Sequence, residues 1–191
     1  MRYHPGHKDE TRKKIVKDAS RRVRAEGLTG AAVSAVMRDA GLTHGGFYKH
    51  FGSKDELLAA SMEEAFREIS ERLARAGQHS PPGKAWKTIV ETYLSPEHAA
   101  HPEFGCPVAA LASELARSEK KVMTRVHAQL ARYKSTILPL MPGRQIADRE
   151  RAYLVIFSTM IGAIQIARMQ PDSAAREKVL STIRGFLLSS F

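Results

Sequence analysis

Apolar residues recur every three to four positions along most of this 191-residue chain, which is the spacing of amphipathic α-helices. The alternation of apolar and polar residues that is typical of strands does not occur. The pattern therefore predicts an all-α protein of about nine helices. We expect these helices over about residues 9–26, 33–40, 44–51, 54–77, 86–94, 107–115, 122–137, 147–169 and 173–189.

Residues that start and stop helices lie between these segments. Ser53 and Glu56 have the spacing of a capping box, in which the hydroxyl and the carboxylate each accept a hydrogen bond from an unpaired backbone amide. Pro107 suits the first turn of a helix, and the Gly, Ser and Pro residues of 77–83 predict a linker. We expect residues 96–105 to form a loop.

Residues 33–51 predict two short helices joined by a tight turn. Gly41 stands where helices commonly end in a left-handed residue, and Thr43 is a good N-cap for the second helix. That helix is too short to be stable alone, so it must pack on the first one. Its outer positions are cationic, hydrogen-bonding or without a side chain: His44, Gly45, Tyr48, Lys49 and His50. Such a surface suits a recognition helix that enters the major groove of DNA.

The formal net charge of +10 also favours a polyanionic partner. Basic residues are densest near the N-terminus: Arg2, Lys8, Arg12, Lys13, Lys14, Lys17, Arg21, Arg22 and Arg24. Phosphate contacts by such residues supply an affinity that does not depend on base sequence and that falls with salt. The alternative is a solvated helix face with no partner.

Several classes of protein are disfavoured by what the sequence lacks. A single cysteine, Cys106, excludes an intramolecular disulfide and a four-cysteine zinc site, and it fits a reducing cytoplasm. No apolar run has the length of a membrane span, and the first residues have no apolar signal core. Glycine-rich phosphate loops, paired carboxylates, nucleophile elbows and metal motifs do not occur. The histidines of the expected tails and loops have no repeated metal spacing: His4, His7, His79, His98 and His101. We therefore expect a cytoplasmic protein that is not an enzyme and that needs no metal or cofactor.

Over about residues 10–60 the sequence resembles the TetR family of bacterial repressors. The resemblance is carried by Ala40-Gly41-Leu42-Thr43, Gly45, Tyr48-Lys49-His50-Phe51 and Ser53-Lys54-Asp55-Glu56-Leu57, with Ile15, Ala19, Val23 and Gly27 upstream. One position departs from the family, because Ala32 stands where Ser or Thr usually precedes the second helix. Alanine cannot cap, which typically costs ~1 kcal/mol, and it has no hydroxyl for a phosphate. We expect Ser34 to make that contact instead.

The resemblance implies a helix-turn-helix DNA-binding domain over residues 1–53. It further implies a helical domain over residues 54–191 that binds an effector and dimerises. In the family, the final two helices of each subunit form a four-helix dimer interface, and a charged residue at Ile164 or Phe186 is expected to break it. A homodimer is physically reasonable because two recognition helices one turn of DNA apart read a palindrome. The alternative is that these two helices belong to the core of a monomer.

The expected DNA contacts divide by chemistry. Side chains expected at phosphates, mostly because the matching family positions contact them, are Ser34, Thr43, Tyr48, His50 and Lys54. Those expected at base edges are His44, Gly45, Gly46 and Lys49. Each glycine weakens a helix by ~1 kcal/mol relative to alanine, which suggests a close approach of the backbone to DNA. A loosened exposed helix is the alternative. We expect Phe47 and Phe51 to belong to the core.

In the resembled family the C-terminal domain binds a small molecule. We expect a largely apolar cavity enclosed by the helices beyond residue 80. Candidate lining residues, each of which is alternatively plain core, are Phe66, Trp86, Tyr93, Phe104, Cys106, Met123, His127 and Phe157. Cys106 precedes Pro107 at a helix start, so it is either a thiol that senses oxidants or electrophiles or a small buried apolar residue.

The sequence therefore favours a TetR-type transcriptional regulator. We expect a repressor that binds a palindromic operator in double-stranded DNA as a homodimer. Its effector is unknown, and a small molecule, an electrophile or an oxidant would release it from DNA. One alternative is a non-specific DNA-binding architectural protein, which would use the same charge without needing Tyr48-Lys49-His50. The other is an enzyme whose N-terminal helices are an accessory, for which no catalytic motif is present.

Overall fold

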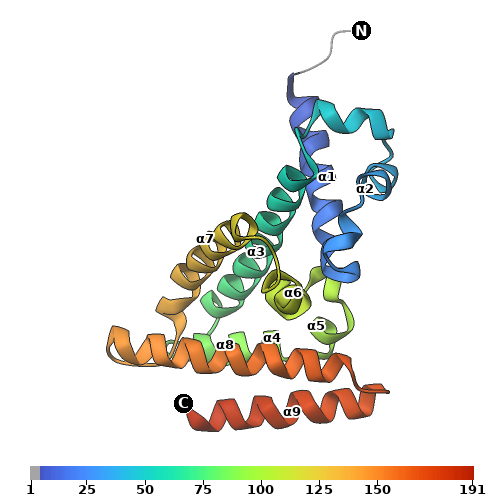
Figure 1. Cartoon of the computed structure of the whole chain (residues 1–191). Helices are drawn as coiled ribbons and strands as arrows, with labels where there is room; N and C mark the ends of the chain where they lie inside the picture. The colour runs from blue at the N-terminus through green and yellow to red at the C-terminus, as the bar shows by residue number, and fades with distance from the viewer. Residues whose placement is uncertain (1–4) are drawn as a thin grey trace.

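The computed structural model describes residues 5–191, which form nine α-helices, four short 3-10 helices and no strand (Figure 1). The α-helices are α1 (Pro5–Glu26), α2 (Val33–Asp39), α3 (Lys54–Gln78), α4 (Ala85–Tyr93), α5 (Pro96–Ala100), α6 (Pro107–Leu115), α7 (Lys120–Ile137), α8 (Ile146–Arg168) and α9 (Ser173–Ser190). The 3-10 helices are η1 (Leu28–Ala31), η2 (His44–Lys49), η3 (Pro102–Phe104) and η4 (Leu138–Leu140). The predicted all-α class is confirmed.

The long helix α3 connects the two ends of the molecule. Figure 1 shows α1 and α2 at one end, with α8 and α9 lying side by side across the opposite end. Leu57, in the first turn of α3, packs in a cluster of buried apolar side chains with α1, α2 and η2. From Met62 onward α3 belongs to a second, larger cluster that includes the helices beyond residue 85. A movement of α3 relative to either cluster would therefore be felt at both ends.

The turn after α2 is fixed by its glycine, as the sequence predicts. Gly41 has φ +75°, a conformation that favours glycine. Its amide donates to the carbonyl of Arg38 (2.9 Å), and the amide of Leu42 donates to that of Met37 (2.8 Å). This pair of bonds is a Schellman motif. The Nζ of Lys14 also donates to the carbonyl of Ala40 (2.9 Å), which ties the turn to α1.

Residues 96–105 were predicted to form a loop, and this is wrong, because they form α5 and η3. The Oγ of Ser95 accepts a hydrogen bond from the amide of His98 (3.2 Å), and Pro96 occupies the first turn. A capping serine followed by proline is a helix start in its own right. The sequence interpretation treated the proline as a breaker only.

Two predicted caps form incompletely. The Oγ of Ser53 accepts from the amide of Glu56 (3.2 Å), but the Glu56 carboxylate accepts from the amide of Gly52 (2.8 Å), one residue before the position that a capping box requires. Thr43 precedes η2 in an extended conformation without a side-chain capping bond. Ala32 precedes α2 and, as expected, supplies no cap.

Candidate nucleic-acid interface

The segment that was predicted as a recognition helix is the 3-10 helix η2, held against α2 by one buried aromatic residue. Phe47 is only 1% exposed and stacks on Phe51 with ring centroids 5.6 Å apart. The next side chain, Tyr48, therefore points outward and is 71% exposed. The core positions predicted for Phe47 and Phe51 are confirmed.

The side chains expected at DNA are accessible around this element. Exposed residues of the set are Ser34, Thr43, His44, Gly45, Tyr48, Lys49 and Lys54, while Gly46 and His50 are half-buried. Seven of the nine belong to the continuous stretch 43–50; Ser34 lies in the first turn of α2, and Lys54 is the first residue of α3. The segment thus presents hydroxyl, imidazole and ammonium groups that can donate to phosphates and base edges.

The two glycines of η2 differ in what surrounds them. A Cβ added to Gly45 would meet nothing within 4 Å, whereas one added to Gly46 would lie 3.5 Å from the Cε of Met37. The fold therefore has room for a side chain at Gly45. A requirement for glycine at this position would have to come from a partner that approaches from outside.

Electrostatics around His50 also favour an anion. Burial lowers the pKa of His50, and the positive charges of Lys8, Arg12 and Lys49 lower it further. Its Nδ1 is buried and has no hydrogen-bond partner among the described residues. A phosphate close to these groups would offset their mutual repulsion and favour the protonated imidazole.

Part of the basic cluster of α1 is used within the protein, and the expected phosphate contacts of the cluster stay a prediction. Arg22 pairs with Asp39 (2.5 Å) and Glu26 (2.6 Å), and Arg12 pairs with Glu56 (3.2 Å). Other members of the cluster bond to the Ala40 carbonyl (Lys14), lie over the Phe104 ring (Arg21) or have a fully buried side chain (Arg24). Lys8, Lys13 and Lys17 remain exposed, and Arg2 lies outside the described residues.

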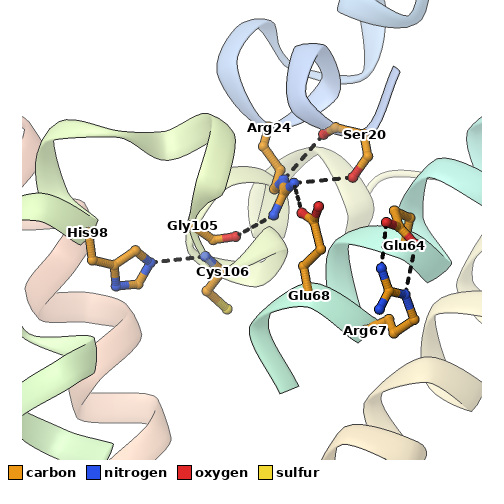
Figure 2. Close-up of polar contacts among 8 residues, drawn as sticks. All are labelled: Ser20, Arg24, Glu64, Arg67, Glu68, His98, Gly105 and Cys106. Atoms are coloured by element: carbon orange, nitrogen blue, oxygen red, sulfur yellow. Dashed lines mark hydrogen bonds and ion pairs between the residues drawn. The ribbon is translucent and has the colours of Figure 1, made fainter. Parts of the chain in front are cut away.

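The buried Arg24 joins the DNA-binding end to the rest of the molecule (Figure 2). From α1 its guanidinium donates to the carbonyl of Gly105 (3.0 Å) and pairs with Glu68 of α3 (2.5 Å). A second link lies at the other end of α6, where the Glu114 carboxylate accepts from the amide of Leu28 (2.8 Å). The last turn of α1 and the residue Leu28 that follows it are therefore tied to the two ends of α6.

On the inner side of Gly105, a buried histidine holds the start of α6. The Nε2 of His98 accepts from the amide of Cys106 (2.9 Å), so its Nδ1 carries the proton that is donated to the carbonyl of Tyr93 (2.7 Å). Burial lowers the pKa of His98 to about 4. The expectation that His98 lies in a loop is wrong, because this neutral imidazole is a bonded member of the core.

The candidate effector residues fall into different surroundings. Phe66, Trp86, Tyr93, Cys106 and Phe157 are buried, Met123 is half-buried, and Phe104 and His127 are exposed. One hollow of about 370 Å³ lies between α3 and α7, and Phe66 and Tyr133 line it. A second, of about 660 Å³, lies between the first half of α3 and residues 117–132. Both hollows use α3 as a wall, unlike the predicted cavity enclosed by helices beyond residue 80.

Sequence reasoning missed three polar residues near Cys106. Tyr133 of α7, Tyr153 of α8 and Arg72 of α3 lie close enough to Cys106 for their charges to interact with it. The sequence predicts only that Tyr133 lies in a helix over about residues 122–137, because spacing along one helix cannot show which helices meet. In the described part of the chain, no helix is long and apolar enough to cross a membrane.

Comparisons with known proteins agree with this geometry. Residues 15–61 match the family model of bacterial regulatory proteins of the tetR family. A TetR transcriptional regulator from Chloroflexus aurantiacus J-10-FL is 26% identical, with a TM-score of 0.76 and 96% of each chain covered. A TetR-family regulator from Cytophaga hutchinsonii has the same fold at 17% identity, with a TM-score of 0.75 and 98% of each chain covered. Reduced NemR from E. coli also shares the fold at 16% identity, with a TM-score of 0.68, covering 92% of this chain and 96% of that one. No curated protein gave a significant sequence match.

The helix pair α2–η2 and the exposed side chains around η2 define a helix-turn-helix DNA-binding protein. Residues 15–61 match the model of the tetR family of bacterial regulatory proteins, and the whole chain shares the fold of TetR-family transcriptional regulators. This is a family of DNA-binding regulators and not of enzymes.

Proposed function

We propose that this protein is a repressor that binds a palindromic operator as a homodimer and leaves it when an effector binds. The observation that carries the proposal is the exposed surface of η2, with Tyr48 71% exposed beside Lys49 and the open position at Gly45. Two buried aromatic residues, Phe47 and Phe51, anchor this surface in the core, and a well-packed support suits sequence-specific readout. We assign residues 1–53 to DNA binding and residues 54–191 to effector binding and dimerisation.

The internal use of the α1 cations disfavours the architectural alternative. A protein that compacts DNA without sequence preference needs many free cations along one face. Here Arg12, Lys14, Arg22 and Arg24 are engaged within the protein. The surface around η2 is better suited to reading a short sequence than to coating DNA.

A second copy of the chain fits the end of the molecule opposite α2. Large apolar side chains are exposed there on α8, at its C-cap and on α9: Leu154, Val155, Ile166, Met169 and Phe186. An added Cβ at Gly162 or Gly185 would meet nothing within 4 Å, so a partner helix can approach these positions closely. Exposed apolar patches of this kind are typical of interaction sites. Ile164, proposed from sequence as an interface residue, is instead fully buried within the protomer.

Release from DNA is proposed to pass through α6. An effector that binds among the C-terminal helices would shift the equilibrium toward the state it binds more tightly. Because Gly105 and Glu114 at the two ends of α6 bond to Arg24 and Leu28, a displaced α6 would carry the DNA-binding end with it. To lower operator affinity 100-fold, the effector must bind the DNA-free state ~2.7 kcal/mol more tightly than the DNA-bound state.

A solved protein of the same fold, FadR from Bacillus subtilis, holds stearoyl-CoA.

Oxidation or alkylation of Cys106 is a second route that we propose to the same state. The thiol is 3% exposed, so a reagent reaches it only when the structure opens locally. Cys106→Ser leaves the main-chain bond to His98 in place and removes the thiol. If wild-type protein leaves its operator on treatment with hydrogen peroxide and Cys106→Ser does not, the redox route holds. An equal response of the two proteins rules it out.

The direct test of the proposed function is selection of bound duplexes from a random DNA pool. The wild-type protein is expected to enrich one palindromic sequence, and Tyr48→Ala, which loses an expected phosphate contact, is expected to bind every sequence more weakly under the same conditions. Enrichment of no sequence by correctly folded wild-type protein would overturn the proposal.

A further inference from the structure

Residues 94–105, which connect α4 to α6, lie between α1 and the apolar end of the molecule. This connecting segment contains α5 and η3 and ends at Gly105. Figure 1 shows α5 between α1 and α8. Arginines of α1 and of α8 both bond to the segment, so it links the DNA-binding end to the helices of the proposed dimer surface.

Two arginines of the apolar end hold one side of the connecting segment. From the last turn of α8, Arg168 donates to the carbonyls of His98 (3.0 Å) and Ala99 (3.2 Å). From α9, Arg184 donates to the carbonyl of Leu94 (2.7 Å). The His98 carbonyl has no helical donor, because the residue four positions further on is a proline without an amide hydrogen. Both helices that carry exposed apolar side chains are therefore bonded to the segment.

Two arginines of α1 hold the segment from the other end of the molecule. The guanidinium of Arg24 donates to the carbonyl of Gly105 (3.0 Å), as Figure 2 shows. One turn earlier, the guanidinium of Arg21 lies 5.0 Å from the centre of the Phe104 ring, a cation–π contact. Because α1 also packs in one buried apolar cluster with α2 and η2, a shift of the connecting segment would be passed on to η2.

Gly105 is the point at which the two sets of contacts meet, and it has no spare room. A Cβ added there would lie 2.9 Å from the guanidinium of Arg168 and 2.9 Å from the imidazole of His98. Its backbone is extended, with φ −85° and ψ −174°, so only this close packing requires a glycine. Close-packed groups transmit a displacement rather than absorb it. A movement of α8 would therefore reach the carbonyl that Arg24 holds.

We propose that the connecting segment sets the separation of the two η2 elements in the dimer, and that Arg168 and Arg184 are positioning residues for operator binding. Both arginines lie at the end of the molecule opposite α2, so neither touches the operator. A palindrome is bound tightly only when the spacing of its half-sites matches the separation of the two recognition elements. This inference rests on the proposed function, because it requires the dimer and its operator.

The separation is measured first without DNA, by pulsed electron paramagnetic resonance between nitroxide labels on the two subunits. The label is attached at Lys13→Cys, an exposed position of α1, in protein that also carries Cys106→Ser and so has one reactive thiol. Arg168→Met and Arg184→Met remove the hydrogen bonds and keep a long side chain. Each is expected to broaden or shift the distance distribution. The matched control Arg151→Met changes an arginine of α8 that is 80% exposed, and it should leave the distribution unchanged.

Operator spacing provides the second readout. Each base pair added between the half-sites moves them apart by about 3.4 Å. Arg168→Met and Arg184→Met should lose about tenfold in affinity at the best spacing and less at other spacings, within the usual range of coupling between sites. Their affinity for a single half-site should equal that of the wild type. A merely structural role would lower the melting temperature and leave the spacing preference unchanged.

Gly105→Ala keeps the proposal falsifiable if an arginine variant dissociates or unfolds. The residue is buried, and its added methyl crowds Arg168 and His98 from inside the protomer. Light scattering is expected to show a dimer with an altered distance distribution.

The outcomes separate the two proposals. A dimer that keeps the wild-type distances and spacing preference in Gly105→Ala and in the folded arginine variants overturns the positioning role and leaves the proposed function intact. A wild-type protein without any distance between subunits refutes the dimer of the proposed function itself.

Discussion

At the scale of single residues, Lys49 and Lys54 are expected to act on different parts of DNA. Lys49 lies at the end of η2, and Lys54 begins α3, where free amides favour a phosphate. Lys49→Ala should relax base preference at one position of each half-site by roughly 1–3 kcal/mol. Lys54→Ala should weaken all sequences alike and reduce the salt dependence by about one phosphate contact. Titrations of operator and single-mismatch duplexes at several salt concentrations distinguish the two; an unchanged base preference in Lys49→Ala would exclude Lys49 from base contact.

His98 makes a second prediction at this scale, for stability against pH. Its pKa is about 4 in the folded protein against an ordinary value of 6.5, so the unfolded chain binds a proton more readily. The neutral imidazole therefore stabilises the fold above about pH 6.5, and this contribution is lost as the pH falls toward about 4, by about 3 kcal/mol. Chemical denaturation across this range should show a steeper loss in wild type than in His98→Gln, whose amide can still accept from Cys106 but does not titrate. If the free energy of unfolding falls with pH equally in the two proteins, His98 is not the group responsible.

At the scale of elements, the sequence predicts what depends on neighbours along the chain. Helix spacing, the glycine turn at Gly41 and the burial of Phe47 all follow from local pattern, and all occur. The 3-10 geometry of η2 does not follow, because a six-residue segment takes its hydrogen-bonding pattern from the helix that it packs on. Residues 96–105 were misjudged because capping by Ser95 was not weighed against Pro96.

The candidate site shows the same division between local and long-range information. The exposed positions of η2 could be predicted because a short motif carries them. The role of Arg24 could not, because it is decided by contacts with helices far along the chain, such as its bond to Gly105. Basic residues look alike in sequence whether they face solvent or the core.

Gly45 tests whether the backbone of η2 approaches DNA. A Cβ there meets nothing in the protein, so Gly45→Ala should fold normally and gain up to about 1 kcal/mol from reduced freedom of the unfolded chain. If the backbone lies against a base pair, the added methyl should weaken operator binding. Thermal unfolding gives the change in stability, and operator titration on the same sample gives the change in affinity. An unchanged operator affinity would leave Gly45 without a role at the DNA.

At the scale of the whole molecule, the exposed apolar end predicts a dimer. Phe186 is 60% exposed on α9, so its replacement leaves the core of each protomer intact. Phe186→Glu should therefore give monomers that are still folded. Ile164 is fully buried, so Ile164→Glu should instead unfold the protein by placing a charge in the core. Light scattering with circular dichroism separates the two outcomes. A wild-type protein that is monomeric at micromolar concentration would refute the dimer.

The central claim is that the dimer reads a DNA sequence through its two copies of η2. It is tested most directly by comparing affinity for the selected palindrome with affinity for a scrambled duplex of the same composition at two salt concentrations. Specific sites are typically bound roughly 1,000-fold or more tightly than non-specific DNA, so the palindrome should be strongly preferred at both salt concentrations. Equal affinities that fall together with salt would mean that the protein binds only the phosphate backbone, and the account would be contradicted.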